Sequence, residues 1–147
     1  MCSSDIIRRM VQKKKNQENS GQVIIPNNHP NPPLPHEMEA ALILSRHYQT
    51  TVEFIVPIDN YLRKSADILM LGAEWELKTP KGASKSTIYK QFRRASKQAK
   101  NIIIDSRYTK LRYERIETSV LLEIKKRHSI KKVILIDKSK NIVEFFR

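Results

Sequence analysis

The stretch that decides the fold runs Asp67-Ile68-Leu69-Met70-Leu71-Gly72-Ala73-Glu74-Trp75-Glu76-Leu77-Lys78-Thr79. Its two halves, 67–71 and 74–79, have the composition of two strands, and the Gly72-Ala73 break between them predicts a hairpin. The first strand is apolar at every position after its leading aspartate, which is typical of a central, buried strand.

The spacing of charges along this hairpin predicts a shared face. With a loop of two or four residues, we expect Asp67 opposite Lys78 and Leu69 opposite Glu76. Because side chains alternate between the two faces of a strand, Asp67, Glu76 and Lys78 then lie on one face. Diagonal cross-strand neighbours are about 7–8 Å apart, so the two carboxylates can share one hard cation beside a lysine. This arrangement suits phosphodiester cleavage.

The opposing interpretation is a Glu-x-Lys pair on an ordinary exposed strand, where both side chains are merely solvated. Asp67 argues against it, because a carboxylate at the end of a buried strand costs free energy unless it is paired or binds a metal.

Length and charge bound the remaining possibilities. The chain has 147 residues, a net charge of +13 and one cysteine. Its length indicates one domain of normal size. The charge favours nucleic acid as a partner, and the absence of an apolar run of about 18 residues argues against a membrane span. A lone Cys2 excludes disulfides within the chain and fits a reducing compartment, so we expect a cytoplasmic protein with no membrane partner.

Periodicity predicts a mixed α/β (α+β) fold, in which helices flank a mixed sheet in three layers. The order from residue 36 is α-β-β-β-α-β-α-β-β, and residues 36–147 form the expected domain. Residues 1–35 are expected as a basic leader, with a short helix over 5–17, and an Asn/Pro-rich linker. The helices are expected at 36–48, 85–100 and 112–127, and the strands at 51–56, 67–71, 74–79, 101–105, 133–136 and 142–146.

The predicted helix over 85–100 carries basic residues and no acidic one. A solvated helix normally mixes both signs to form ion pairs along its surface, so a single sign favours a phosphate-binding surface. The loop between Thr79 and Lys85 leads into the helix N-terminus, where phosphate binds favourably. The residues expected to contact nucleic acid are Thr79, Lys81, Lys85, Lys90, Arg93, Arg94, Lys97 and Gln98.

Three strings of this sequence resemble a known family. They are 66–69 (Ala-Asp-Ile-Leu), 75–82 (Trp-Glu-Leu-Lys-Thr-Pro-Lys-Gly) and 98–105 (Gln-Ala-Lys-Asn-Ile-Ile-Ile-Asp). Together they resemble PD-(D/E)XK nucleases, and more narrowly the C-terminal tRNA-nuclease toxin domain of contact-dependent growth inhibition (CdiA) proteins. That domain usually ends a very large secreted protein, whereas this chain begins at Met1, so an intracellular or mobile-element role is also expected.

The resemblance implies a catalytic set of Glu39, Asp67, Glu76 and Lys78. Asp67, Glu76 and the backbone carbonyl of Leu77 are implied to bind Mg²⁺ (or Mn²⁺). The implied activity is hydrolysis of a phosphodiester bond, with tRNA as the favoured substrate, and a cognate immunity or antitoxin protein is an implied partner.

Three other interpretations stay open on the sequence. The chain could be a DNA endonuclease of the same superfamily from a mobile element. It could be a nucleic-acid-binding protein that has lost catalysis. It could also be a metal-independent ribonuclease that attacks through the RNA 2′-hydroxyl.

Overall fold

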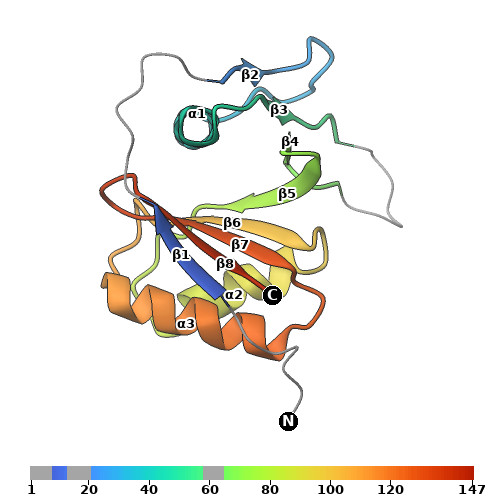
Figure 1. Ribbon diagram of the computed structural model, residues 1–147. Helices are drawn as coiled ribbons and strands as arrows, with labels where there is room; N and C mark the ends of the chain where they lie inside the picture. Colours follow the sequence, from blue (N-terminus) through green and yellow to red (C-terminus); the bar gives the residue numbers. More distant parts are fainter. Residues whose placement is uncertain (1–7, 13–20, 58–64) are drawn as a thin grey trace.

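The computed structural model describes residues 8–12, 21–57 and 65–147, which build an eight-stranded mixed sheet and three helices (Figure 1). The sheet order is β1-β8-β7-β6-β5-β4-β3-β2. The helices are α1 (Pro35–Tyr48), α2 (Thr87–Ala95) and α3 (Tyr113–Lys126). The strands are β1 (Arg8–Gln12), β2 (Val23–Ile24), β3 (Val52–Phe54), β4 (Ile68–Met70), β5 (Ala73–Lys78), β6 (Asn101–Asp105), β7 (Lys132–Ile136) and β8 (Ile142–Phe146).

The mixed α/β class is confirmed, and so is the element order from α1 onward. The strands β5, β6 and β7 run parallel to one another, with α2 and α3 as the two crossovers. The strands β3, β4 and β5 form antiparallel pairs, as do β7 and β8. In the described part of the chain, no helix is long and apolar enough to cross a bilayer.

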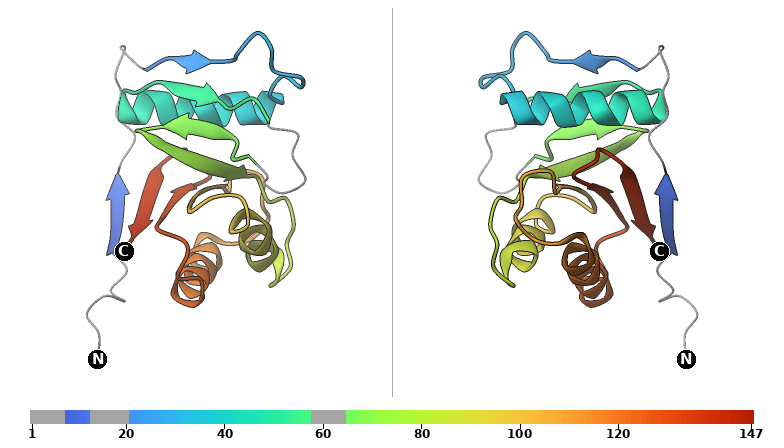
Figure 2. Two further views of the ribbon diagram at one scale, coloured as in Figure 1. Left: turned by 90° about the vertical axis from the view of Figure 1, so that its right-hand side faces the viewer. Right: turned by 90° about the vertical axis from the view of Figure 1, so that its left-hand side faces the viewer.

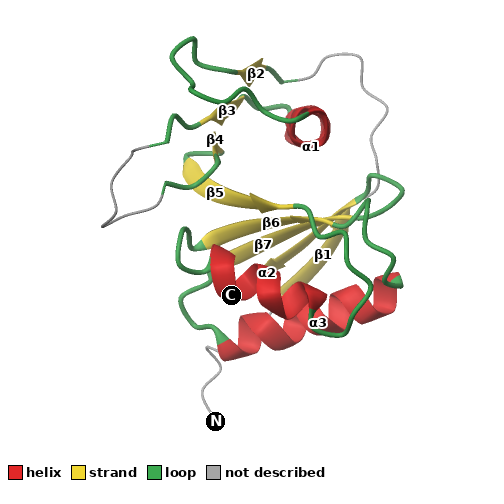
Figure 3. Ribbon diagram, turned by 180° about the vertical axis from the view of Figure 1, so that it is seen from behind, coloured by secondary structure: helices red, strands yellow, loops and turns green. Residues whose placement is uncertain are grey.

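Two apolar layers hold the sheet between its helices (Figures 2 and 3). On one face, α2 and α3 pack against alternate residues of β6, β7 and β8, including Ile102 and Ile104. On the other face, α1 packs against β3, β4 and β5 and against Ile103 of β6. Consecutive isoleucines in β6 are therefore all buried, because each face of this central strand has its own helical cover.

The hairpin turn differs from the expected one. Leu71 and Gly72 both have positive φ, at 54° and 72°, so they form the two-residue turn. Such turns match the right-handed twist of the strands they join. Ala73 is then the first residue of β5 and pairs with Met70.

The expected register, with Asp67 opposite Lys78 and Leu69 opposite Glu76, is therefore wrong. Leu69 pairs with Glu74, and Ile68 pairs with Trp75. The reason is that the turn lies on Leu71-Gly72 and not on Gly72-Ala73. This change moves the pairing by two residues, and a two-residue shift leaves each side chain on its expected face.

The expected helix over 5–17 is wrong at residues 8–12, where the chain forms β1; the rest of that range lies outside the described residues. The backbone of β1 pairs antiparallel with all five residues of β8, and β2 pairs parallel with β3. The segment 1–35, expected as leader and linker, thus contributes two strands to the sheet. Pairing with a distant edge strand outweighs a local helical pattern, because it satisfies the unpaired backbone groups of that edge.

Candidate active site

The β4–β5 hairpin brings Asp67 directly onto the backbone of β5. The N–H of Asp67 donates to the carbonyl of Trp75 at 3.0 Å. Its carboxylate oxygen Oδ2 accepts the N–H of Leu77 at 2.8 Å. These two bonds go to the residues on either side of Glu76 and hold Asp67 next to it.

Glu76 is a buried acid, with only 3% of its surface exposed. It lies on the face of β5 opposite Trp75 and Leu77, whose side chains pack under α1. The Nζ of Lys78, on the same face, is 3.5 Å from Oε1 of Glu76. Asp67, Glu76 and Lys78 therefore come together at one place.

Gln98 completes this group from the connection between α2 and β6. With its amide nitrogen turned toward Glu76, Gln98 donates to Oε1 and Oε2 at 2.8 and 2.7 Å. The expected helix over 85–100 is shorter than predicted, because α2 ends at Ala95 and a turn follows. The turn is required since Asn101 has to begin β6 beside Trp75.

Burial, followed by the neighbouring carboxylate of Asp67, raises the pKa of Glu76 to about 9. Lys78 opposes this effect without cancelling it. Two acids in contact cannot both ionise at low free-energy cost, so one of them keeps a proton. A divalent cation between them would remove that cost.

The donor atoms of this group fit a hard cation. Leu77 directs its N–H toward Asp67, and the N–H and C=O of one strand residue point to the same neighbouring strand. The carbonyl of Leu77 thus faces the side where Asp67 lies. Two carboxyl groups and a carbonyl are oxygen ligands of the kind Mg²⁺ prefers, with water filling the other positions. Across 21–57 and 65–147, no three His, Cys, Asp or Glu side chains cluster as a larger ligand set.

The basic side chains of the expected nucleic-acid surface lie on α2 and in the segments directly before and after it. In the described chain, Lys81, Lys85, Lys90, Arg93, Arg94 and Lys97 are all exposed, and no ion pair joins any of them to an acid. Thr79 is partly exposed at the end of β5, directly after Lys78. Gln98 comes three residues after the end of α2 and contacts Glu76. The segment that carries the basic residues therefore ends at the carboxylate group.

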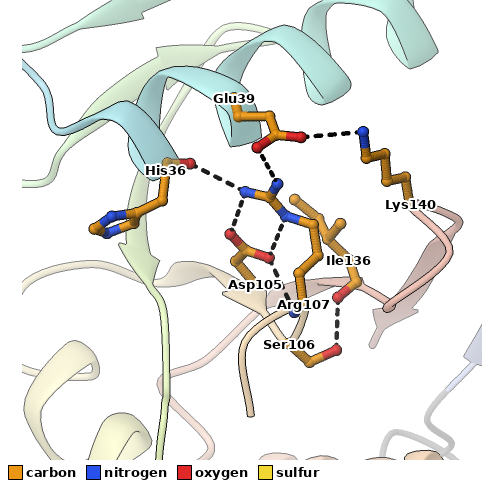
Figure 4. Close-up of polar contacts among 7 residues, drawn as sticks. All are labelled: His36, Glu39, Asp105, Ser106, Arg107, Ile136 and Lys140. Atoms are coloured by element: carbon orange, nitrogen blue, oxygen red, sulfur yellow. Dashed lines mark hydrogen bonds and ion pairs between the residues drawn. The ribbon is translucent and has the colours of Figure 1, made fainter.

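Glu39 lies in a different cluster, on α1 (Figure 4). Its carboxylate binds Arg107 Nη1 at 2.8 Å and Lys140 Nζ at 3.0 Å. The hydrogen bond from Lys140 has the largest effect, followed by Arg107, and together they hold the pKa of Glu39 below its usual value. Among the described residues, Glu39 forms no hydrogen bond or ion pair with Asp67, Glu76 or Lys78, and its catalytic role stays a prediction.

Arg107 and Asp105 are central to that second cluster, and sequence reasoning missed both. Asp105 is fully buried and binds Arg107 through both oxygens, at 2.9 Å to Nε and 2.8 Å to Nη2. Arg107 also donates to the backbone carbonyl of His36 at 3.0 Å. The signal was present in the sequence: an aspartate that ends a buried strand needs a charged partner close by.

Comparison with known proteins gives two findings and one absence. Residues 64–142, more than half of the chain, match the family described as contact-dependent growth inhibition CdiA C-terminal domain. The fold is similar to a solved structure described as the CdiA-CT/CdiI toxin and immunity complex from Burkholderia pseudomallei. The two share a TM-score of 0.57 and 19% identity, over 86% of this chain and 100% of that one. A search of curated proteins finds no match.

The family match covers the hairpin, α2, β6 and α3, and so includes Asp67, Glu76, Lys78 and Gln98. The narrower resemblance noted from the sequence is thereby confirmed at the level of the family. The chain belongs to the family of contact-dependent growth inhibition CdiA C-terminal domains.

Proposed function

We propose that this chain is a metal-dependent nuclease of the PD-(D/E)XK type, which hydrolyses phosphodiester bonds in RNA and favours tRNA. The observation that carries the proposal is the contact between Asp67 and the buried Glu76, with Lys78 3.5 Å from Glu76. Asp67 directly before one strand, Glu76-x-Lys78 on the next and Gln98 beyond the following helix together resemble the active sites of that superfamily.

Each residue has a separate task in this proposal. Asp67, Glu76 and the Leu77 carbonyl would hold Mg²⁺ or Mn²⁺, which supplies an activated water and neutralises charge on the phosphate. Lys78 stabilises the negative charge that develops on the phosphate oxygens. Gln98 fixes the carboxyl group of Glu76 by donating to both of its oxygens.

The basic residues on α2 and in the segments directly before and after it bind the substrate backbone. Because no acidic partner neutralises them among the described residues, their charges are available to phosphate. Thr79 lies where β5 ends, next to the proposed reacting phosphate, and its hydroxyl is a hydrogen-bond donor.

We further propose a toxin role in the cytoplasm of the cell in which the domain acts, since tRNA is present there. The related Burkholderia structure is described as a toxin with its immunity protein. By analogy, a cognate immunity protein is the proposed inhibitor of this chain.

The test is to incubate the purified chain with total tRNA and, separately, with plasmid DNA, each with Mg²⁺ or with EDTA. We expect the parent chain to produce tRNA fragments with Mg²⁺ but not with EDTA. We expect no fragments from Glu76→Gln or Lys78→Ala. The matched control is Glu114→Gln, which removes an exposed carboxylate on α3. Cleavage of tRNA in EDTA would select the metal-independent mechanism, and cleavage of plasmid alone would select a DNA endonuclease.

A further inference from the structure

Tyr108 is a large aromatic side chain left in solvent at the edge of the sheet where β5, β6 and β7 end. It follows β6 by three residues and is 44% exposed. Large aromatic side chains normally gain free energy by burial, so an exposed ring has contact area open to a partner.

The ring is held in place on the protein side. The guanidinium of Arg107 lies 5.0 Å from the ring centroid of Tyr108. The ring of His36 meets it in an edge-on arrangement, with centroids 6.0 Å apart and planes at 72°. Arg107 itself is fixed by Asp105 and Glu39 (Figure 4). An exposed ring fixed in this way loses little conformational freedom when a ligand stacks on it.

The loop that carries Tyr108 is tied to the loop that leaves the candidate active site. The hydroxyl of Thr109 donates to the carbonyl of Gly82 at 2.8 Å, and Gly82 follows Lys78 by four residues. In the sheet, Lys78 pairs with Ile104 of β6. Four residues of chain reach at most about 14 Å, so Gly82, to which the Tyr108 loop is bonded, lies within a few nucleotides of a phosphate held at Lys78.

The surroundings of the ring carry the charge that a polynucleotide needs. Lys81 and Lys110 are exposed on the two loops that Thr109 joins. A phosphate backbone that leaves Lys78 along this edge would pass the two loops that carry these cations. An aromatic ring among lysines is the usual composition of a single-strand binding surface.

We propose that Tyr108 stacks on an unpaired nucleobase of the RNA substrate, close to the bond that is cut. This inference rests on the proposed function and adds to it, since it specifies single-stranded RNA and not a duplex at this position. In a duplex the base faces are already stacked on their neighbours, so only an unpaired base can present one to Tyr108.

The test is binding without cleavage, with all variants made in the Glu76→Gln background and without metal. The probes are one fluorescein-labelled single-stranded RNA and the same RNA annealed to its complement. Base–aromatic stacking contributes about 1–3 kcal/mol, so Tyr108→Leu should weaken single-strand binding about 5- to 150-fold. Tyr108→Phe, which keeps the ring, should bind like the parent.

Duplex binding should change little in either variant, because the bases of a duplex are already stacked. The thermal midpoint should also change little, because the ring is exposed and its loop is held by Thr109. An abasic nucleotide at one position of the single strand should reproduce the Leu effect in the parent and add nothing to it in Tyr108→Leu. Equal single-strand affinity for Leu and Phe, or an equal loss on duplex, would overturn the proposal. Binding is read without catalysis, so failure of the nuclease proposal appears separately, as intact tRNA in the cleavage assay.

Discussion

Asp67 and Glu76 meet across the β4–β5 hairpin as two acids in contact, with the carboxylate of Asp67 held on the N–H of Leu77. Among the described residues, neither acid forms an ion pair with an arginine or a histidine, and the Nζ of Lys78 is 3.5 Å from Glu76. In a sheet, directly opposed like charges are destabilising. Such a pair at the end of two central strands is the reason to assign this place a ligand-binding role.

The pH dependence of stability should report this pair in the metal-free protein. The pKa of Glu76 is raised to about 9 by burial and by Asp67, so the folded chain holds a proton that the unfolded chain loses near pH 4.5. Stability from this group is therefore present below about pH 4.5 and is lost as pH rises toward 9. Denaturant melts at pH 5, 7 and 9 should show the decline, and Glu76→Gln should flatten it. The same decline in Glu76→Gln and in the parent would assign it to other groups.

We predict that Gln98 contributes to activity, although it lies far in sequence from the hairpin that carries Glu76. Its amide donates to both oxygens of Glu76, and residues that orient a metal ligand typically contribute 10- to 100-fold. We expect Gln98→Ala to lower the cleavage rate of tRNA by about that factor with little change in substrate affinity. Gln91→Ala, a partly exposed glutamine on α2, is the control and should cleave at the parent rate. Equal rates for the two variants would remove Gln98 from the site.

Loss of Arg93 and Arg94 together should act on binding and leave the chemistry intact. Each exposed cation that contacts a phosphate contributes about 0.7–0.9 to the slope of log affinity against log salt. The double alanine variant should therefore flatten that slope by about 1.4–1.8, measured with Glu76→Gln protein between low and physiological salt. The control is the pair Lys125→Ala and Lys126→Ala on α3. A slope that changes only in the control would place the RNA on α3.

Removal of Arg107 should unfold the chain more readily than removal of any surface cation. Asp105 is fully buried, and Arg107→Met would leave its charge without an ionic partner, at a cost of about 3–5 kcal/mol. Lys140→Ala breaks a pair exposed by 45% on the lysine side and should cost less than about 1 kcal/mol. Urea denaturation measures both. Equal midpoints would mean that the cluster in Figure 4 contributes little to stability.

Much of the fold could be predicted because its signals are local. The Gly72 break, the apolar run that became β6 and the apolar stripe of α2 each lie within one element. The contact of Asp67 with Glu76 also follows from a short hairpin. The expected register was wrong by two residues, and a shift of two residues keeps both side chains on the same face.

The parts that were missed depend on distant partners. The backbone of β1 pairs with β8, at the other end of the chain. The local sequence pattern of residues 8–12 does not indicate that this partner strand exists. The Arg107 cluster joins the end of β6 to α1 and to the turn before β8, through Glu39 and Lys140. Sequence spacing places Glu39 on a helix but cannot say which cations that helix will meet.

The most direct measurement of the central claim is a calorimetric titration of the metal-free chain with Mn²⁺ at pH 7.5. The account predicts binding of a divalent ion with release of protons, since Glu76 must give up its proton to bind metal. It also predicts that Asp67→Asn and Glu76→Gln each abolish the binding while Glu114→Gln keeps it. No binding by the parent chain, or the same binding by all four proteins, would contradict the assignment of Asp67 and Glu76 as a metal site.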